Sequence, residues 1–466
     1  MFQNYVITAF RNFRKYKGYT FLNILGLTIG IACSLLIVLW ITDELHVDKF
    51  HKKDAQLYQM LRNMYQSDGH VITTEAIPQP VKPLLETKYP EVDKVTLIGW
   101  ENEFLFQKDE KIFREKGRYV SPEFFEVFSF PLISGDPATA MDDIHSIVIS
   151  ESLARKYFTS IENTLGQTLH INDAQDFKVT GIFKDFPKTS SLQLNWVIPV
   201  EEYISRNDWV ESWFNGGFSI AFTLKEGTDV ITFGKKIEQE VNEHTNHEAD
   251  ERLIFQKYGD RYLHSTFENG VNTGGRIDYV NLFIVVTIFM IVIACVNFMN
   301  LATARSVRRA QEIGIRKVMG AGKLTLGLQF ITEAVVIAFI STFLSILTAI
   351  LLLPYFNQFT GKDMILDLNS PQVWTIMLAV ATVTGFLSGS YPALLLPSFK
   401  LTNSLKGTLK HSPAAQFFRK GLVVFQFSIS ILLIVGTIAV YRQMDYIMSK
   451  NLGVDKENLV FMEMEG

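Results

Sequence analysis

Residues 320–324 have the types and spacing of part of a phosphate-binding loop. The segment reads Gly-Ala-Gly-Lys-Leu, and a lysine after glycines can contact nucleotide phosphates. A complete loop also needs a glycine five residues before Gly322, where Lys317 stands, and a Ser or Thr after the lysine, where Leu324 stands. The sequence therefore predicts no nucleotide site, no bound cofactor and no enzyme in this chain.

Two groups in the middle of the chain could support other chemistry. His244 and His247, three residues apart between glutamates, could hold a metal on one helix face, and Asp142-Asp143 could act as an acid–base pair. No His-Glu-x-x-His, Gly-x-Ser-x-Gly or Cys/His array accompanies them. A solvated polar turn and an exposed loop are therefore the favoured interpretations, and no metal site is predicted.

Residues 302–326 combine a basic surface with an apolar stripe. The stripe, at helical spacing, consists of Val307, Ala310, Ile313 or Gly314, and Val318 or Met319. Arg308–Glu312 and Glu312–Arg316 are i,i+4 pairs that support the same helix. A short helix of this kind suits docking into a groove on another protein. A basic helix beside the membrane that contacts lipid headgroups explains the pattern equally well.

The elements around this helix are apolar runs long enough to cross a bilayer, which takes roughly 20 helical residues. Four runs contain no charge and the other contains only Glu333, whereas a charge at a helix centre costs about 2.5–3.5 kcal/mol on insertion. We therefore expect an α-helical polytopic membrane protein. The expected spans are residues 20–41, 280–301, 327–353, 373–396 and 421–440.

The distribution of Lys and Arg predicts the orientation of these spans. Residues 1–19, 302–326 and 397–420 together carry 15 basic residues and one acidic residue. The positive-inside rule places these three segments in the cytoplasm, together with the N-terminus. Residues 42–279, 354–372 and 441–466 are then extracytoplasmic. Net charge is only −4, without a basic block that would indicate nucleic acid binding.

The segments before and after the first span predict two further elements, a helix and a folded domain. Residues 1–19 have apolar residues at helical spacing and predict a cytoplasmic amphipathic helix, although an ordinary basic flank of the first span fits as well. Residues 42–279 mix helical stretches such as 150–158 with strand-like ones at 146–149, 177–183 and 220–224. We therefore expect a large extracytoplasmic α+β domain between the first and second spans.

Several motifs resemble those of the FtsX-like permeases of ABC transporters, the MacB-type family. The strongest is Glu-Ile-Gly-Ile-Arg-Lys-Val-Met-Gly-Ala at 312–321, after Asn-Phe-Met-Asn-Leu-Ala-Thr-Ala-Arg-Ser at 297–306. Gly-Ser-Tyr-Pro-Ala at 389–393 belongs to the same resemblance, and residues 121–125, 146–154 and 179–182 resemble the MacB-like periplasmic core domain. The resemblance covers essentially the whole chain.

The resemblance implies a function for the helix after the second span. In that family it is a coupling helix that contacts a separate cytoplasmic ABC ATPase, and ATP-driven closure moves the outer domain, a process called mechanotransmission. The resemblance also implies a bacterial inner (plasma) membrane location, and it leaves open export or extraction of a lipoprotein, peptide or drug, regulation of envelope enzymes, and a periplasmic partner. The positions carried over to the ATPase contact are Arg308, Glu312, Gly314, Arg316, Lys317 and Gly320.

The fifth span departs from the four-span members of the family. Phe-Arg-Lys precedes both the first span, at 13–15, and the fifth, at 418–420. This similarity predicts that residues 421–466 open a second copy of the unit, so that the partner would be a second permease repeat or a permease dimer. A five-span protein is the alternative.

Two other functions compete with the permease hypothesis. A secondary transporter usually has ionisable groups or broken helices near the midplane, yet spans one, two and five are uncharged. A membrane-anchored receptor with an extracytoplasmic binding domain would leave the basic helix at 305–319 unexplained.

Overall fold

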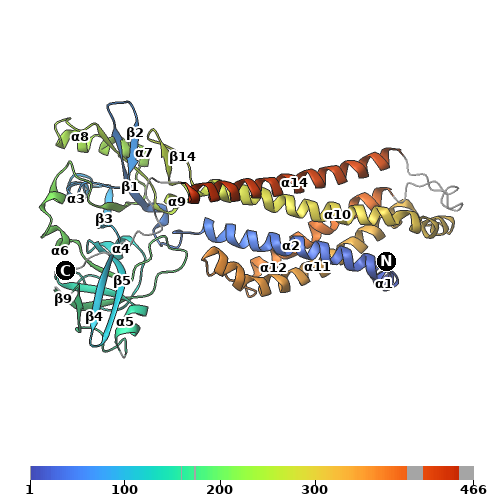
Figure 1. Ribbon diagram of the computed structural model, residues 1–466, viewed down its shortest axis with the longest axis horizontal. Coiled ribbons are helices and arrows are strands. Elements are labelled where there is room, and N and C mark those ends of the chain that lie inside the picture. The colour runs from blue at the N-terminus through green and yellow to red at the C-terminus, as the bar shows by residue number, and fades with distance from the viewer. Residues whose placement is uncertain (1, 159, 173–174, 396–412, 451–466) are drawn as a thin grey trace. The chain divides into compact units, whose positions relative to one another are not determined.

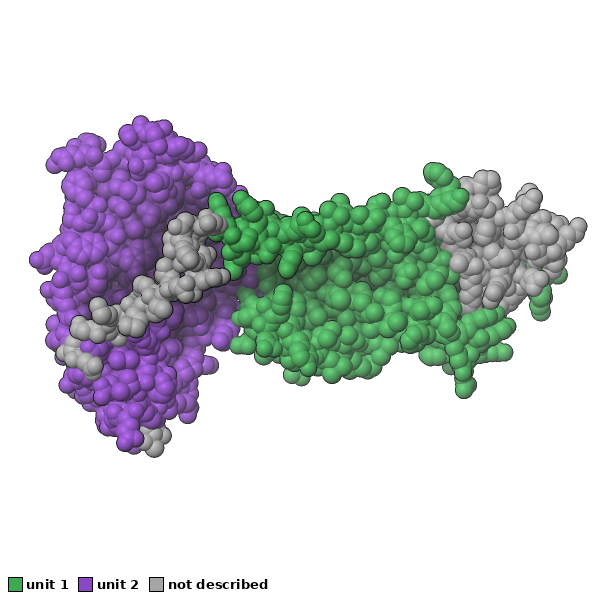
Figure 2. All heavy atoms as spheres, in the orientation of Figure 1, with its two compact units in different colours: residues 1–42, 281–463 green, residues 43–280, 464–466 purple. Residues whose placement is uncertain are grey.

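The computed structural model describes residues 2–158, 160–172, 175–395 and 413–450. Within its helices, the side chains of residues 2, 4, 303–313, 395, 413–416 and 418–419 lie outside the described part. The chain divides into two compact units (Figure 2): a helical unit, and an outer unit formed by residues 43–280.

The helical unit consists of long apolar helices (Figure 1). Its helices are α1 (Phe2–Lys15), α2 (Lys17–Leu45), α10 (Arg276–Val318), α11 (Lys323–Thr360), α12 (Pro371–Leu395) and α14 (Pro413–Ser449). Among the described residues, the helices long and apolar enough to cross a membrane number five: α2, α10, α11, α12 and α14. The predicted fold class, a polytopic membrane protein with a large domain between the first and second spans, is confirmed.

The helix predicted after the second span is not a separate element. Helix α10 continues without a break from Arg276 to Val318 and ends before residue 326, while α11 already begins at Lys323. The physical reason is that residues 302–313 contain neither Pro nor Gly, so nothing interrupts the helix that the second span starts. The last helix, α14, likewise extends on both sides of the predicted residues 421–440.

Two pairs of glycines, each four residues apart, let helices of this unit approach closely. A Cβ atom at Gly30 of α2 would lie 2.8 Å from the Cβ of Ala294 on α10, and one at Gly26 would lie 3.1 Å from Asn297. Gly385 and Gly389 of α12 face α11 in the same way, at 2.7 Å from Val335 Cα and 2.8 Å from Ala334 Cβ. Both pairs have the Gly-x-x-x-Gly spacing that brings membrane helices into contact.

The outer unit is an α+β domain. Its strands are β1 (Leu57–Tyr65), β2 (Val71–Thr74), β3 (Val92–Ile98), β4 (Asn102–Lys108), β5 (Lys111–Val120), β6 (Leu132–Ser134), β7 (Ser146–Ser150), β8 (Thr168–Ile171), β9 (Gln175–Phe183), β10 (Trp196–Pro199), β11 (Ser219–Leu224), β12 (Glu251–Lys257), β13 (Thr266–Glu268) and β14 (Val271–Gly274). Its helices are α3 (Val81–Lys88), α4 (Phe124–Val127), α5 (Glu151–Tyr157), α6 (Val200–Ile204), α7 (Val230–Ile237), α8 (Glu240–His244) and α9 (Tyr258–Arg261), with 3₁₀ turns at Asp54–Gln56 and Asp208–Glu211.

The strands form one large sheet with two regions. The pairings β5–β4–β8–β9–β7–β10 close into a ring, because β10 also pairs with β5 in parallel. From β5 the sheet continues through β3, β11 and β1 to β12 as an antiparallel sheet, and β2 pairs with β1. A fully buried Trp196 fills the ring and donates its indole N–H to the carbonyl of Glu115 at 2.8 Å.

The strands expected from the sequence are present. Residues 146–149, 177–183 and 220–224 lie in β7, β9 and β11, whose side chains are largely buried. The predicted helix at 150–158 is α5, and Ser150 caps it by accepting a hydrogen bond from the Leu153 N–H. Apolar alternation and turn chemistry were therefore sufficient to locate these elements.

One histidine of the outer unit is buried without a charged partner in contact. His51 is 4% exposed and lies among the rings of Phe50, Phe128, Phe130 and Tyr258, with centroids 4.2–5.8 Å from its own. Its Nδ1 accepts the Ser129 N–H at 3.3 Å, so the proton of the neutral ring sits on Nε2. Burial, helped by the positive charge of Arg261, lowers the pKa of His51 to about 4.

This depressed pKa predicts a loss of outer-unit stability in mild acid. Unfolded chains bind a proton at the His51 position below an ordinary pKa of about 6.5, whereas the folded state resists protonation down to about pH 4. Above pH 6.5 the neutral His51 ring costs no stability. Below it the free energy of unfolding decreases as pH falls, and the loss amounts to roughly 3 kcal/mol at pH 4. Tryptophan-fluorescence melting of the full chain at pH 7 and pH 4.5 measures it. His51→Phe should flatten this pH dependence, and an unchanged slope would refute the assignment.

Candidate functional site

Helix α10 is too long to lie within a bilayer. Its 43 residues span about 65 Å at 1.5 Å per residue, twice the roughly 30 Å of a hydrocarbon core. The apolar part covers Arg276–Ala302. The remaining residues, 303–318, therefore extend about 24 Å beyond the apolar part as a continuous basic helix.

The end of α10 is fixed by its capping geometry. The Ala321 N–H donates to the Arg316 carbonyl at 2.9 Å, and the Gly320 N–H donates to the Lys317 carbonyl at 3.1 Å. This pair of bonds is a Schellman motif, which needs a left-handed residue after the helix. Gly320 supplies it with φ +94°, and its Cβ position faces open space. The Gly-Ala-Gly-Lys segment thus serves as the turn between α10 and α11.

A buried polar contact joins this turn to α11. The Arg316 guanidinium donates through Nη1 to Gln329 Oε1 at 2.6 Å, and Gln329 is 9% exposed. Glu333, one turn further along α11, is also buried. The Arg316–Gln329 hydrogen bond and the Schellman motif together hold the two helices at a defined angle.

Several apolar side chains at and beside the turn are exposed. Ile315, Val318, Met319 and Leu324 have exposed fractions of 54, 66, 81 and 77%. Lys317 and Lys323 lie among them, and burial together with the charge of Lys323 lowers the pKa of Lys317. We call these four apolar residues the α10 turn patch. Exposed apolar side chains rimmed by polar groups are typical of a surface that another protein or the membrane covers.

The structure brings together four of the six residues predicted for this site. Gly314, which is buried, Arg316, Lys317 and Gly320 all lie at the end of α10 or in its cap. The backbone of Arg308 and Glu312 belongs to the same helix, but their side chains lie outside the described part. Sequence reasoning missed Ile315, which lies three and four residues before Val318 and Met319, and Leu324, which lies in the first turn of α11.

The other candidate residues from the sequence, the His244–His247 and Asp142–Asp143 pairs, make contacts typical of helix and turn packing. His244 stacks on Trp213 with ring centroids 4.1 Å apart and contacts Glu240, its helical neighbour. Asp143 accepts the N–H of His145 at 2.9 Å in a turn. Over the described ranges, no three His, Cys, Asp or Glu side chains converge as metal ligands would.

Comparisons with known proteins match both units. The MacB-like periplasmic core domain model matches residues 20–240, and the FtsX-like permease C-terminal model matches residues 284–401. The chain is 25% identical over 291 residues to the macrolide export ATP-binding/permease protein MacB of Aggregatibacter actinomycetemcomitans, covering 60% of this chain and 40% of that one. It is 26% identical over 196 residues to the uncharacterized ABC transporter permease YknZ of Bacillus subtilis, covering 41% of this chain and 45% of that one. The chain thus spans less than half the length of these relatives.

Solved structures give weaker matches, restricted to less than half of the chain. A domain of a putative permease from Porphyromonas gingivalis aligns with a TM-score of 0.38 at 19% identity, covering 45% of this chain and 93% of that one. The periplasmic region of MacB from Actinobacillus actinomycetemcomitans aligns with a TM-score of 0.33 at 16% identity, covering 44% of this chain and 90% of that one.

Proposed function

The chain belongs to the FtsX-like, MacB-type family of ABC transporter permeases, and from this premise we propose that it couples ATP hydrolysis by a partner to movement of its outer unit. The ATPase resides on a separate cytoplasmic subunit, and the α10 turn patch is where that subunit docks. The N-terminus and the turn between α10 and α11 are cytoplasmic. The observation that carries this proposal is the continuity of α10 from Arg276 to Val318.

A continuous helix transmits displacement where a hinged one absorbs it. Unbroken i→i−4 hydrogen bonds link the turn after Val318 to Arg276, which lies two residues after the end of β14 of the outer unit. The Schellman cap at Gly320 and the Arg316–Gln329 bond attach α11 to the same turn. A force applied at the turn would therefore move α10 as one body. The moved cargo is a lipoprotein, a peptide or a drug, or the outer unit regulates an envelope enzyme.

We expect Met319→Asp to uncouple the chain from its ATPase. Met319 is 81% exposed, so the aspartate can be solvated without unfolding the permease, but it would place an uncompensated charge inside the docked interface. Central interface residues carry about 2 kcal/mol or more, a loss of roughly 30-fold in affinity. The measurement is co-purification with the cytoplasmic ATPase and stimulation of its hydrolysis by the permease in nanodiscs.

Ile365→Asp is the matched control, because Ile365 is also 81% exposed but lies between α11 and α12, on the side predicted to be extracytoplasmic. It should retain ATPase binding and stimulation. Equal behaviour of the two variants would place the docking surface elsewhere. Ion-driven uptake by the chain alone in liposomes would instead favour a secondary transporter.

A further inference from the structure

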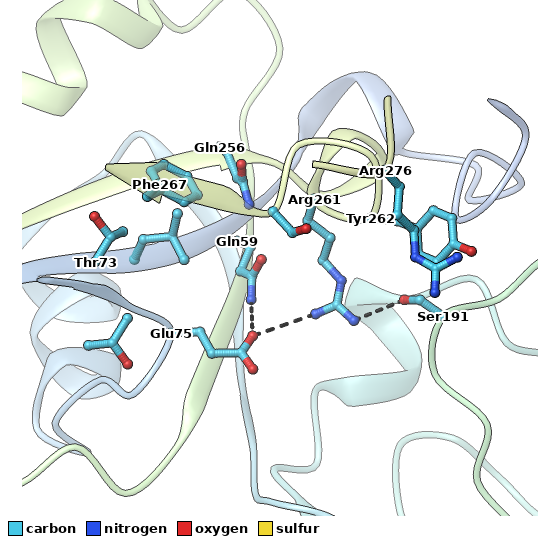
Figure 3. A pocket seen from close by; sticks show the side chains of 12 residues that line it. Gln59, Thr73, Glu75, Ser191, Gln256, Arg261, Tyr262, Phe267 and Arg276 are labelled. Atoms are coloured by element: carbon cyan, nitrogen blue, oxygen red, sulfur yellow. Dashed lines mark hydrogen bonds and ion pairs between the residues drawn. The ribbon is translucent and has the colours of Figure 1, made fainter. Parts of the chain in front are cut away.

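The outer unit contains a polar cavity that the coupling function does not use. Its volume is about 480 Å³, within the range of small-molecule sites. Segments far apart in the sequence line it: Gln59 and Glu75 come from β1 and the end of β2, Ser191 from a loop before β10, and Gln256, Arg261 and Phe267 from β12, α9 and β13 (Figure 3). Opposite charges and amides therefore face one pocket, which is open to solvent.

Arg261 is the central group of the cavity, and its side chain is only 19% exposed. Nη2 donates to Ser191 Oγ at 2.9 Å, and the guanidinium lies over the ring of Tyr258, 4.6 Å from its centroid. The two nearest carboxylates are further away: Asp48 Oδ2 is 3.8 Å from Nε and Glu75 Oε2 is 3.9 Å from Nη1. Charge-assisted N–H···O bonds are about 2.7–2.9 Å long, so Nη1 is held beside Glu75 without a hydrogen bond to it.

Neighbouring groups preorganise both charges. Behind Arg261, the fully buried Asp48 accepts the Ser191 N–H at 2.7 Å and also the Ser191 hydroxyl, and this fixes the serine that Arg261 contacts. On the other side, Gln59 Nε2 donates to Glu75 Oε2 at 2.6 Å. Figure 3 shows Glu75 and Arg261 pointing toward each other across the cavity, with Gln59 and Ser191 bonded to them. Donors and acceptors that neighbouring groups already hold in place cost little to organise when a ligand binds.

We propose that this cavity binds a free α-amino acid as its zwitterion. The carboxylate would accept from Arg261 Nη1, and the ammonium would donate to Glu75. The two protein charges are 3.9 Å apart, which suits a ligand whose charged groups are attached to one carbon atom and does not suit one whose charges are separated by several bonds. Simple anions face repulsion from Glu75, and simple cations face repulsion from Arg261.

The remaining walls indicate the kind of side chain. Phe267 lies on one side of the cavity and Leu61 also lines it, so an apolar or aromatic side chain would bury its surface there. Gln256 supplies an amide at the same end. The expected ligands are therefore amino acids such as phenylalanine and leucine.

This inference does not rest on the coupling function. Binding is measured on the full-length chain in detergent, with no ATPase present, so a failure of docking at the α10 turn patch leaves the result unaffected. Conversely, absence of ligand binding would not bear on ATPase stimulation.

Isothermal titration of the full chain with L-phenylalanine and L-leucine tests the proposal. At least one should bind saturably, whereas L-phenylalaninamide and N-acetyl-L-phenylalanine, which each lack one charge, should bind about 10- to 100-fold more weakly. Glu75→Gln keeps a hydrogen-bond acceptor for Gln59 but removes the charge. It should weaken binding of the amino acid by a similar factor.

Glu126→Gln is the control, because the Glu126 side chain is 47% exposed against 43% for Glu75 and also pairs with a basic residue, Lys94, outside the cavity. It should bind like the parent chain. The proposal is overturned if neither amino acid binds, if the amide and the acetyl derivative bind as well as the parent compound, or if Glu75→Gln leaves the affinity unchanged.

Discussion

Gly30→Leu and Gly389→Leu should each destroy the packing of the helical unit. A Cβ at Gly30 would lie 2.8 Å from the Cβ of Ala294, and one at Gly389 would lie 2.8 Å from the Cβ of Ala334, so neither leucine has a flexible neighbour to displace. Overpacking costs about 1–3 kcal/mol or more, and the close helix contact is lost in addition. We expect little monodisperse protein on gel filtration in detergent, and a strongly lowered thermal midpoint for what remains.

Gly436→Leu is the matched control for both variants. Gly436 lies in α14, an apolar helix of the same unit, and its Cβ position has no neighbour within 4 Å among the described residues. Leucine there should be tolerated, because no described residue lies close enough to clash with it. If Gly436→Leu is as damaging as Gly30→Leu, insertion or helix propensity explains the defect and close packing does not.

A paired exchange between α2 and α10 tests the contact itself. Among the described residues, the new methyl group in Gly30→Ala meets Ala294 Cβ at 2.8 Å and the Met290 carbonyl at 3.8 Å and no other atom within 4 Å. Removing the opposing methyl group with Ala294→Gly should therefore restore the thermal midpoint that Gly30→Ala lowers. Without such restoration the two helices are not in contact at these positions.

The spans could be predicted because their signal is local. Each is a run of about 20 residues with at most one charge, and no soluble arrangement accounts for five of them. Some strands of the outer unit could be predicted for the same reason, through apolar alternation at 177–183 and 220–224. Helix ends were harder to predict: the predicted span ends at residue 353, whereas α11 extends to Thr360, where Gly361 in a left-handed conformation terminates it.

The candidate coupling site could be predicted only in part from the sequence. The segment 312–321 indicated the site, but the apolar stripe was assigned to a single helix, whereas the exposed apolar residues belong to both α10 (Ile315 and Val318) and α11 (Leu324). Gly26-x-x-x-Gly30 and Gly385-x-x-x-Gly389 were visible signals that were not used. Their spacing predicts close packing but does not say which helix lies opposite.

The cavity around Arg261 had no sequence signal. Gln59, Glu75, Ser191 and Arg261 are spread over more than 200 residues, and the sheet pairings that assemble them are long-range. None has a spacing that a motif would record. Buried polar groups of this kind become recognisable only when their partners and distances are known, because isolated Arg and Glu residues are otherwise expected at the surface.

Loss of either partner of the Arg62–Glu251 pair should severely destabilise the outer unit. Arg62 of β1 and Glu251 of β12 are 4 and 7% exposed, and Nη1 lies 2.8 Å from Oε2. Burial raises the pKa of Glu251 even though Arg62 opposes this shift, so desolvation of the carboxylate is substantial. Glu251→Leu would leave the guanidinium uncompensated in the core, at a cost of about 3–5 kcal/mol. Tryptophan-fluorescence melting of the full chain should show a large decrease in the thermal midpoint.

The double replacement decides whether the pair itself is stabilising. Replacing both partners, as in Arg62→Met with Glu251→Leu, removes both desolvation penalties and keeps apolar volume, so most of the stability lost in Glu251→Leu should return. Glu238→Leu is the control, because its pair with Arg252 on the same strand is about 40% exposed and should contribute at most about 1 kcal/mol. A double variant that is no more stable than Glu251→Leu would mean that Arg62 makes a second essential contact. The Arg62 Nη2 atom, which lies 2.8 Å from the Cβ position of Gly216, is where that contact would be sought.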